Sequence, residues 1–210
     1  MLLWINGPFG GGKTQTAHEI RRRLPGSVIC DPEHAGFGLR RMLPPGLRGD
    51  FRDLLSWRQG VVEVLDLALT GHEGVVIVPM TVTDSGCFAE TVGRLRERGH
   101  DVRHFTLLAE RETVLRRLRE RGFGHLLLFA AGKNAGLRRE SWAVQQLDHC
   151  LESLREPEFA EHLWTDDTTV PKTADRIAVL AGLRLTPNTD SRLRTRLRRT
   201  AVGLRHIRFD

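Results

Sequence analysis

GPFGGGKT, at residues 7–14, is the segment that predicts the fold class of this 210-residue chain. It matches G-x-x-x-x-G-K-[ST] at every fixed position. Glycines permit the turns that bring backbone N–H groups close to phosphates, and a helix that starts here points its positive end at them. In this pattern Lys13 neutralises charge on the β- and γ-phosphates, and the Thr14 hydroxyl ligates Mg²⁺. The segment therefore predicts a site for ATP and Mg²⁺. The expected nucleotide contacts are Gly7, Gly10, Gly11, Gly12, Lys13, Thr14 and Gln15.

The chain around this loop alternates between strand-like and helix-like segments. Short apolar runs, typical of buried parallel strands, occur at residues 2–6, 27–30, 75–79, 102–108 and 162–165. Helix patterns occupy residues 14–24, 57–69, 86–98, 111–121, 138–154 and 170–183, and Gly122 is expected to end the helix at 111–121. This order predicts an α/β fold of the three-layer P-loop NTPase type. Its five-stranded parallel sheet should carry helices on both faces.

The expected domain organisation is one domain at residues 1–183 and a basic amphipathic tail at 184–210. A helical insert is expected at about residues 34–58, where the pattern is irregular and Pro-Pro-Gly stands at 44–46. A lid is expected at about residues 119–138, because four glycines punctuate residues 122–136.

Composition places the chain among ordinary soluble proteins, with 40% hydrophobic and 28% charged residues. No apolar run reaches the roughly 20 residues that span a bilayer, and the start of the chain lacks the features of a signal peptide. We therefore expect a cytoplasmic protein. The three cysteines, Cys30, Cys87 and Cys150, are far apart and form no C-x-x-C pair, so a disulfide framework or a zinc site is not expected.

The net charge of +6 belongs entirely to the tail. Residues 184–210 contain eight arginines and two aspartates, whereas the preceding 183 residues carry 24 basic and 24 acidic side chains. A basic amphipathic segment can pack on the body, lie at the inner surface of a membrane, bind nucleic-acid phosphates or stay disordered. The pattern leaves these possibilities open, and peripheral membrane contact is one of them.

Asp31 is the leading candidate for an acid–base residue. It follows the strand at 27–30, and Pro32 keeps it out of helical geometry. We expect this strand to lie beside the strand at 2–6, so that Asp31 faces the γ-phosphate at the carboxyl edge of the sheet. There it could orient or deprotonate a hydroxyl, or help to hold Mg²⁺. The alternative is an aspartate that only caps the next turn.

Arginines form three groups along the chain. Planar guanidinium groups stabilise the charge that develops during phosphoryl transfer, and a closing lid excludes water. Of the eleven, Arg117, Arg121 and Arg138 are expected to act in catalysis. The others are Arg40, Arg41, Arg52, Arg58, Arg111, Arg116, Arg119 and Arg139.

An acidic residue is absent at the end of the strand at 75–79, which continues as Met80-Thr81. Asp84 is the nearest carboxylate. Either Asp84 reaches back, or Asp31 and water complete the Mg²⁺ shell. Motor-type ATPases rely on an acid at that point, so this class is disfavoured.

These segments together resemble the tunicamycin-resistance ATP-binding proteins, small P-loop kinases similar to nucleoside-monophosphate kinases and chloramphenicol phosphotransferase. The resemblance covers residues 2–183 and is carried by WINGPFGGGKTQTA at 4–17, DPE at 31–33, DF at 50–51, WR at 57–58, VPMT at 78–81 and RESW at 139–142. It implies five parallel strands, a lid, an insert that receives the second substrate, and Asp31 facing the accepting hydroxyl. Tunicamycin contains uridine, so a nucleoside-like acceptor fits.

The residues expected to contact the acceptor lie mostly in the insert. They are Glu33, Phe37, Arg40, Phe51, Trp57, Arg58 and Thr81. The aromatic members could stack on a base or cover a lipid tail, and core packing is the alternative for each of them.

Three functions remain open from the sequence. The leading one is a kinase that phosphorylates a hydroxyl of a nucleoside-type antibiotic. The second is an ATP-dependent protein that binds the drug without phosphotransfer. The third is a nucleic-acid-associated NTPase, which the neutral body of the chain and the absent strand-end acid disfavour.

Overall fold

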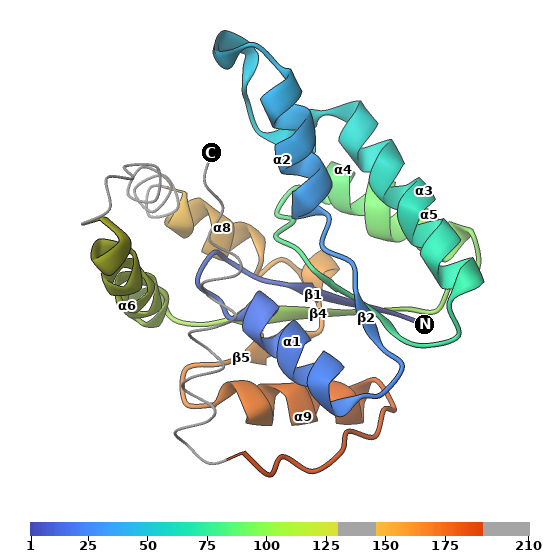
Figure 1. Ribbon diagram of the computed structural model, residues 1–210, viewed down its shortest axis with the longest axis vertical. Helices are drawn as coiled ribbons and strands as arrows, with labels where there is room; N and C mark the ends of the chain where they lie inside the picture. Colours follow the sequence, from blue (N-terminus) through green and yellow to red (C-terminus); the bar gives the residue numbers. More distant parts are fainter. Residues whose placement is uncertain (130–145, 191–210) are drawn as a thin grey trace.

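The computed structural model describes residues 1–129 and 146–190, with no side-chain description for residues 121–129. Its centre is a five-stranded parallel sheet in the order β2-β3-β1-β4-β5 (Figure 1). The strands are β1 (Leu2–Asn6), β2 (Val28–Ile29), β3 (Val76–Pro79), β4 (Val102–Leu108) and β5 (His162–Trp164). The predicted fold class is confirmed.

The position of β2 differs from the expectation. β3 lies between β2 and β1 and pairs with both, Ile77 being in register with Ile29 on one side and with Leu3 on the other. The prediction that the second strand lies beside the first is therefore wrong. Strand order depends on which apolar faces meet in space, and a continuous apolar run such as residues 75–79 fits any interior position of a parallel sheet.

Helices cover both faces of the sheet, with α1 and α9 on one side and α3 to α5 on the other (Figure 1). The first layer consists of α1 (Lys13–Arg23) and α9 (Val170–Leu180). The second contains α3 (Leu55–Gly71) and one continuous helical segment made of α4 (Ser85–Phe88), the π-helical turn η3 (Ala89–Gly93) and α5 (Arg94–Glu97). Beyond one end of the sheet lie α6 (Arg111–Phe129), α8 (Leu147–Ser153) and the short turn η4 (Pro157–Phe159).

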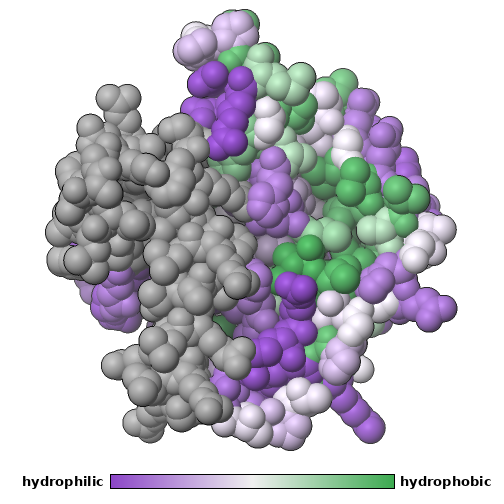
Figure 2. All heavy atoms as spheres, viewed as in Figure 1, coloured by the Kyte–Doolittle hydropathy of each residue, from purple (hydrophilic) through white to green (hydrophobic). Residues whose placement is uncertain are grey.

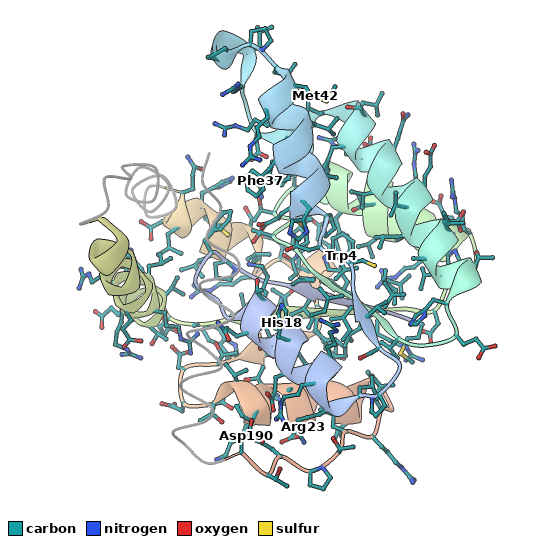
Figure 3. All side chains as sticks on the ribbon, in the orientation of Figure 1. Trp4, His18, Arg23, Phe37, Met42 and Asp190 are labelled. Atoms are coloured by element: carbon teal, nitrogen blue, oxygen red, sulfur yellow. The ribbon has the colours of Figure 1, made fainter. Side chains whose placement is uncertain are left out.

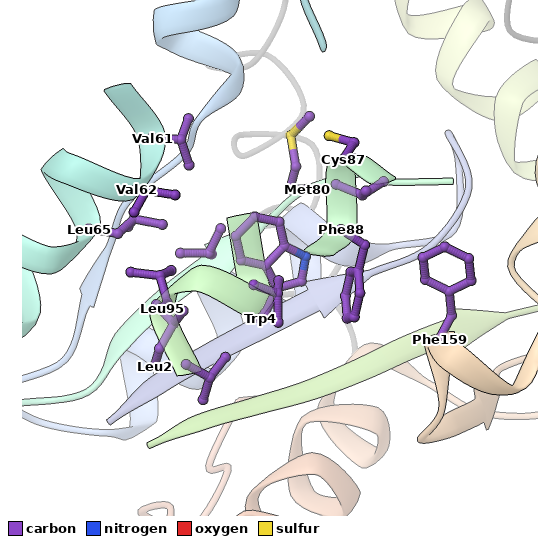
Figure 4. Close-up of a cluster of buried hydrophobic side chains, with 14 of the residues drawn as sticks. Leu2, Trp4, Val61, Val62, Leu65, Met80, Cys87, Phe88, Leu95 and Phe159 are labelled. Atoms are coloured by element: carbon purple, nitrogen blue, oxygen red, sulfur yellow. The ribbon is translucent and has the colours of Figure 1, made fainter. Parts of the chain in front are cut away.

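Alternate residues of β1 divide the core into two halves, because side chains of a strand point to opposite faces. Leu2 and Trp4 pack with α3 and α5, and Figure 4 shows Trp4 enclosed among these apolar side chains. Leu3 and Ile5 pack instead with α1 and α9. All four are 0% exposed, so β1 and the loop that follows it start from a fixed position.

The region between β2 and α3, where the insert is predicted, is helical. It comprises α2 (Glu33–Met42) and the 3₁₀ turns η1 (Pro45–Leu47) and η2 (Phe51–Asp53). In Figure 1, α2 projects from the sheet and carries η1 at its far end. Met42 and Leu47, near this end, are exposed.

Gly122 does not end the helix at 111–121, since α6 continues through Gly122 and Gly124 to Phe129. Glycine in a helix interior costs only about 1 kcal/mol relative to alanine, which the neighbouring residues can offset. Most of the expected lid after residue 129, including Arg138, and the tail after residue 190 lie outside the described residues. Trp142 and the start of the expected helix at 138–154 do so as well.

On the face seen in Figure 2, hydrophilic atoms gather over the α1 and α9 side, and hydrophobic atoms gather around β2 and α3. Val64 and Leu67 of α3 are 62% and 74% exposed, in contrast to the buried Val61 and Leu65 on its inner face. Among the described residues, no helix is long and apolar enough to cross a membrane.

Candidate active site

The loop at residues 7–14 connects β1 to α1 and lies at the carboxyl edge of the sheet. Gly7 has φ +146°, and a Cβ there would lie 2.7 Å from the Leu107 carbonyl oxygen, so only glycine fits. Gly10 has φ +77° and packs against Val114 and Leu118 of α6. The loop is thus held between β4 and α6, with the first N–H groups of α1 directed to the place where phosphates bind.

Lys13 is 7% exposed and folds back over its own loop. Its Nζ donates to the carbonyl oxygens of Gly7 (2.9 Å) and Pro8 (3.0 Å) and lies 5.6 Å from the centre of the Phe9 ring. A buried ammonium needs such acceptors because it has been taken out of water. Phosphate oxygens are stronger, charged acceptors for the same group.

Asn6 and Thr81 tie this loop to the segment that follows β3. The Asn6 side chain accepts from Gly7 N (2.8 Å) and Val82 N (3.0 Å) and donates to Val82 O (2.8 Å). The Thr81 hydroxyl donates to Gly7 O (2.9 Å). Asn6 was not predicted as a site residue. A polar residue that ends a buried apolar strand is the signal for it, since a buried amide must be hydrogen-bonded.

Asp31 lies at the same edge of the sheet, one strand further from the loop than expected, because β3 separates β2 from β1. Its Oδ1 accepts from Glu33 N (3.0 Å), at the start of α2. The neighbouring Pro32 carbonyl accepts from the Trp57 indole N–H (3.0 Å), which fixes this turn against α3. The turn-capping bond expected in the alternative interpretation is therefore present. A carboxylate has about four acceptor positions, so this bond leaves room for another donor.

Arg52 connects the insert to the phosphate loop. Its guanidinium binds both carboxylate oxygens of Asp50 and donates to the Thr81 carbonyl (3.1 Å). The Thr81 hydroxyl in turn donates to the Gly7 carbonyl. Burial alone would raise the pKa of the Asp50 carboxyl, but the hydrogen bonds and charge of Arg52 outweigh it and hold the pKa below its usual range. Arg52 was not among the predicted site residues. No sequence signal distinguishes it from its neighbouring arginines except Asp50 two positions before it.

A pocket of about 110 Å³ opens between the insert and the segment after β3. The insert side of the pocket consists of η2 and the first turns of α3, and the opposite side belongs to the segment from Val82 to α4. Its lining residues are Asp50, Arg52, Asp53, Arg58, Val82, Thr83, Asp84 and Cys87. Val82 is bonded to Asn6, so the pocket adjoins the base of the phosphate loop.

Some of the residues predicted to contact the acceptor lie at or near the pocket, and the aromatic ones pack against one another. Arg58 lines the pocket, where it donates to Glu90 (3.1 Å) and to the Arg52 carbonyl (2.7 Å). Thr81 is buried and directly precedes Val82, which lines the pocket. Arg40 is close enough to Asp50 for its charge to lower the pKa of that carboxyl. Phe37, labelled on α2 in Figure 3, and Phe51 are half-buried and meet edge to face at 5.3 Å.

Trp57 is a core residue. It is 1% exposed, and its ring lies 5.4 Å from that of Phe51. The core-packing alternative therefore describes Trp57 better than the expected contact with a substrate.

Among the predicted catalytic arginines, Arg117 is the one whose side chain is described. It donates to the Thr165 hydroxyl (3.0 Å) and to the Thr165 carbonyl. The next residue, Leu118, packs on Gly10 of the phosphate loop. Arg117 therefore lies between that loop and the segment after β5. The Arg121 side chain and all of Arg138 lie outside the described residues.

Asp84 does not reach back to the phosphate loop. Its Oδ1 accepts from Cys87 N (2.7 Å) and so caps α4. Burial raises the pKa of the Cys87 and Cys150 thiols to about 11, which makes both unreactive at neutral pH.

A magnesium site must draw on few protein oxygens. Within residues 1–129 and 146–190, no group of three or more His, Cys, Asp or Glu side chains could hold a metal. Mg²⁺ commonly takes one or two protein oxygens and fills its shell with nucleotide phosphates and water. The half-buried Thr14 hydroxyl in the first turn of α1, together with a carboxylate at the same edge, fits that requirement.

Comparison with known proteins identifies the family. A family model described as an AAA domain matches residues 2–126. The structure of the Deinococcus radiodurans tunicamycin resistance protein superposes with a TM-score of 0.70 at 33% identity, covering 89% of this chain and 99% of that one. The chain belongs to the tunicamycin-resistance family of P-loop kinase-like proteins. The resemblance found in the sequence is confirmed.

More distant structures share the fold of this tunicamycin-resistance family member. Shikimate kinase from Bacteroides thetaiotaomicron has a TM-score of 0.53 at 20% identity, with 87% of this chain and 99% of that one covered. The Mycobacterium tuberculosis APS kinase CysC, in complex with AMPPNP and APS, has a TM-score of 0.51 at 13% identity, with 86% and 96% covered. Among curated proteins, none matched the chain.

Proposed function

We propose that this protein is an ATP-dependent phosphotransferase that phosphorylates a hydroxyl of a nucleoside-type antibiotic such as tunicamycin. The observation that carries the proposal is that the Lys13 loop, the Asp31 carboxylate and a polar pocket under the insert all lie at the carboxyl edge of the sheet. The 33% identity with a tunicamycin resistance protein supports the choice of acceptor.

In the proposed reaction, ATP lies on the loop at 7–14, and Lys13 Nζ moves from the Gly7 and Pro8 carbonyls to the β- and γ-phosphate oxygens. The acceptor hydroxyl oxygen attacks the γ-phosphorus, and its proton passes to the Asp31 carboxylate. The bond from the γ-phosphorus to the β,γ-bridging oxygen breaks, which leaves ADP and the phosphorylated acceptor. Asp31 then returns its proton to water.

Charge and water must both be controlled during this transfer. Arg117, held at Thr165, would contact the transferring group, and the lid arginines Arg121 and Arg138 would join it when the lid closes. Thr14 would hold Mg²⁺, and nucleotide phosphates and water would complete its shell, because Asp31 serves as the base. When bound, the ion neutralises charge on the phosphate oxygens.

The test is mass spectrometry of tunicamycin and simple nucleosides after incubation with ATP and Mg²⁺. We expect a phosphorylated product, and a loss of rate of at least about 100-fold in Asp31→Asn, the usual size of a general-base effect. Asparagine keeps the side-chain oxygen that accepts from Glu33 N, so the turn should survive. Glu97→Gln, an exposed change on α5, is the matched control and should retain full activity.

Binding of the drug without phosphate transfer would contradict the kinase proposal. It would instead support the second function, a protein that sequesters the drug in the presence of ATP. In that case Asp31→Asn should still confer resistance in cells.

A further inference from the structure

The charges that line the pocket under the insert indicate which kind of ligand it can bind. Its lining residue Val82 is hydrogen-bonded to the Asn6 side chain. Two residues earlier in the chain, the Met80 N–H donates to the Ile5 carbonyl near the end of β1. An acceptor group in this pocket would lie beside the phosphate loop, on the side of the sheet where Asp31 and α2 stand. The pocket is therefore well placed to hold the acceptor of the proposed reaction.

Both arginines of the pocket already have carboxylate partners. Arg52 binds the two oxygens of Asp50 and the Thr81 carbonyl. Arg58 is paired with Glu90 and held by the Arg52 carbonyl. A phosphate or carboxylate ligand entering the pocket would have to displace these pairs, and leaving a partly buried carboxylate without its arginine is costly.

Two further carboxylates line the same pocket. Asp53 is exposed and, among the described residues, makes no hydrogen bond or ion pair through its side chain. Asp84 uses Oδ1 to cap α4. With three aspartates against two arginines, the lining has a formal charge of −1, and the neighbouring charges of Glu90 and Arg40 offset each other.

This arrangement suits one kind of ligand. Carboxylates accept hydrogen bonds and offer none when ionised, so they bind hydroxyl groups well and repel anions. Sites that bind phosphates or carboxylates show the opposite arrangement, with arginines turned to the ligand.

We propose that this pocket binds an uncharged, polyhydroxylated part of the acceptor, such as a sugar, and that Asp53 and Asp84 select it against anionic analogues. The inference rests on the proposed function for its acceptor site. Nucleoside monophosphates and acids should bind poorly, and Asp53 and Asp84 are the two residues responsible for this selectivity.

The experiment compares uridine with uridine 5′-monophosphate, which differ in charge at one position. Their dissociation constants are measured by calorimetry on the full chain with AMPPNP and Mg²⁺ present, and tunicamycin serves as a second neutral probe. Because AMPPNP does not transfer its phosphate, binding is read without catalysis. We expect the wild type to prefer uridine at least tenfold. Asp53→Asn combined with Asp84→Asn should reduce the preference to less than threefold, mainly through tighter binding of the monophosphate.

The double substitution is designed to leave the fold intact, since asparagine is as good a helix cap as aspartate. Glu97→Gln is again the control, and its preference should equal that of the wild type. The proposal is overturned if the monophosphate binds as tightly as uridine, if neither neutral probe binds, or if the double variant keeps the wild-type preference. If the wild type prefers uridine to the monophosphate but transfers no phosphate from ATP, the proposal for the pocket holds and only the kinase reaction is rejected.

Discussion

At the scale of single residues, Lys13 is a buried cation held by two carbonyl groups of its own loop. In Lys13→Met the charge is lost while the aliphatic side chain is kept. We expect phosphotransfer to fall by at least about 100-fold, the size of the loss when one charged or polar donor is removed from an active site. Initial rates with ATP check this, and Lys172→Met on the exposed side of α9 is the control. Equal rates in the two variants would contradict the role of Lys13.

His104 gives a second prediction at this scale. Burial beside Phe88, together with the nearby charges of Arg96 and His162, lowers the pKa of His104 to about 4. The hydrogen bond between Nδ1 and the Ala160 carbonyl acts in the opposite direction and is outweighed. The unfolded chain binds this proton below about pH 6.5 and the folded chain only below about pH 4. Stability should therefore fall as the pH drops through this window, by about 2 kcal/mol between pH 7 and pH 5.

Urea unfolding at pH 7 and pH 5 measures this loss. His104→Asn keeps a donor near the Nδ1 position but cannot take up the proton. The loss of about 2 kcal/mol between pH 7 and pH 5 that is expected for the wild type should therefore be absent from the free energy of unfolding of this variant. Parallel pH dependence of the two proteins would show that His104 is not responsible.

At the scale of elements, α2 and η2 meet at Gly36, where a Cβ would lie 2.3 Å from the Phe51 ring. Gly36→Ala must push α2 or Phe51 aside, and we expect it to destabilise the protein by about 1–3 kcal/mol, as overpacking usually does. Gly38→Ala, two residues along the same helix, meets nothing within 4 Å and should stabilise it by about 0.5–1 kcal/mol. Thermal unfolding of both variants checks the opposite signs. Two shifts in the same direction would contradict this packing.

The elements themselves were largely predictable, because each strand is a short apolar run with a clear stop. The position of β2 was not, since Val28 and Ile29 carry no mark of the strand they pair with. The continuation of α6 beyond Gly122 was also missed, because helix propensity is a weak local preference that neighbouring residues can override.

At the scale of the whole molecule, the phosphate loop could be predicted because its chemistry lies in consecutive residues. The pocket could not, because it is assembled from residues 50–58 and 82–87, which meet only when η2 packs against the segment after β3. In that arrangement Asp50 and Arg52 form a partly buried pair. The general rule is that contacts between distant segments depend on tertiary packing, and a sequence pattern does not display them.

The last prediction concerns how residues 184–190 are attached to the body of the protein. Arg23, at the end of α1, is 4% exposed, and its guanidinium donates to Asp175 of α9 (2.6 Å) and to Thr186 O (2.7 Å). Figure 3 shows Arg23 and Asp190 on this side of the molecule. Arg23→Met removes both contacts, and we expect a loss of about 2 kcal/mol together with faster proteolysis within residues 184–190.

Arg103→Met supplies the control, because Arg103 and Asp101 form an exposed pair that contributes less than about 1 kcal/mol. The α1 helix separates Arg23 from the phosphate loop by about 16 Å, the length of 11 residues, so ATP affinity should be unchanged in Arg23→Met. Urea unfolding, limited proteolysis read by mass spectrometry, and ATP titration measure the three quantities. Unchanged proteolysis at 184–190 would mean that the hydrogen bonds from the Thr186 backbone N–H and hydroxyl to the Arg23 carbonyl hold the segment by themselves.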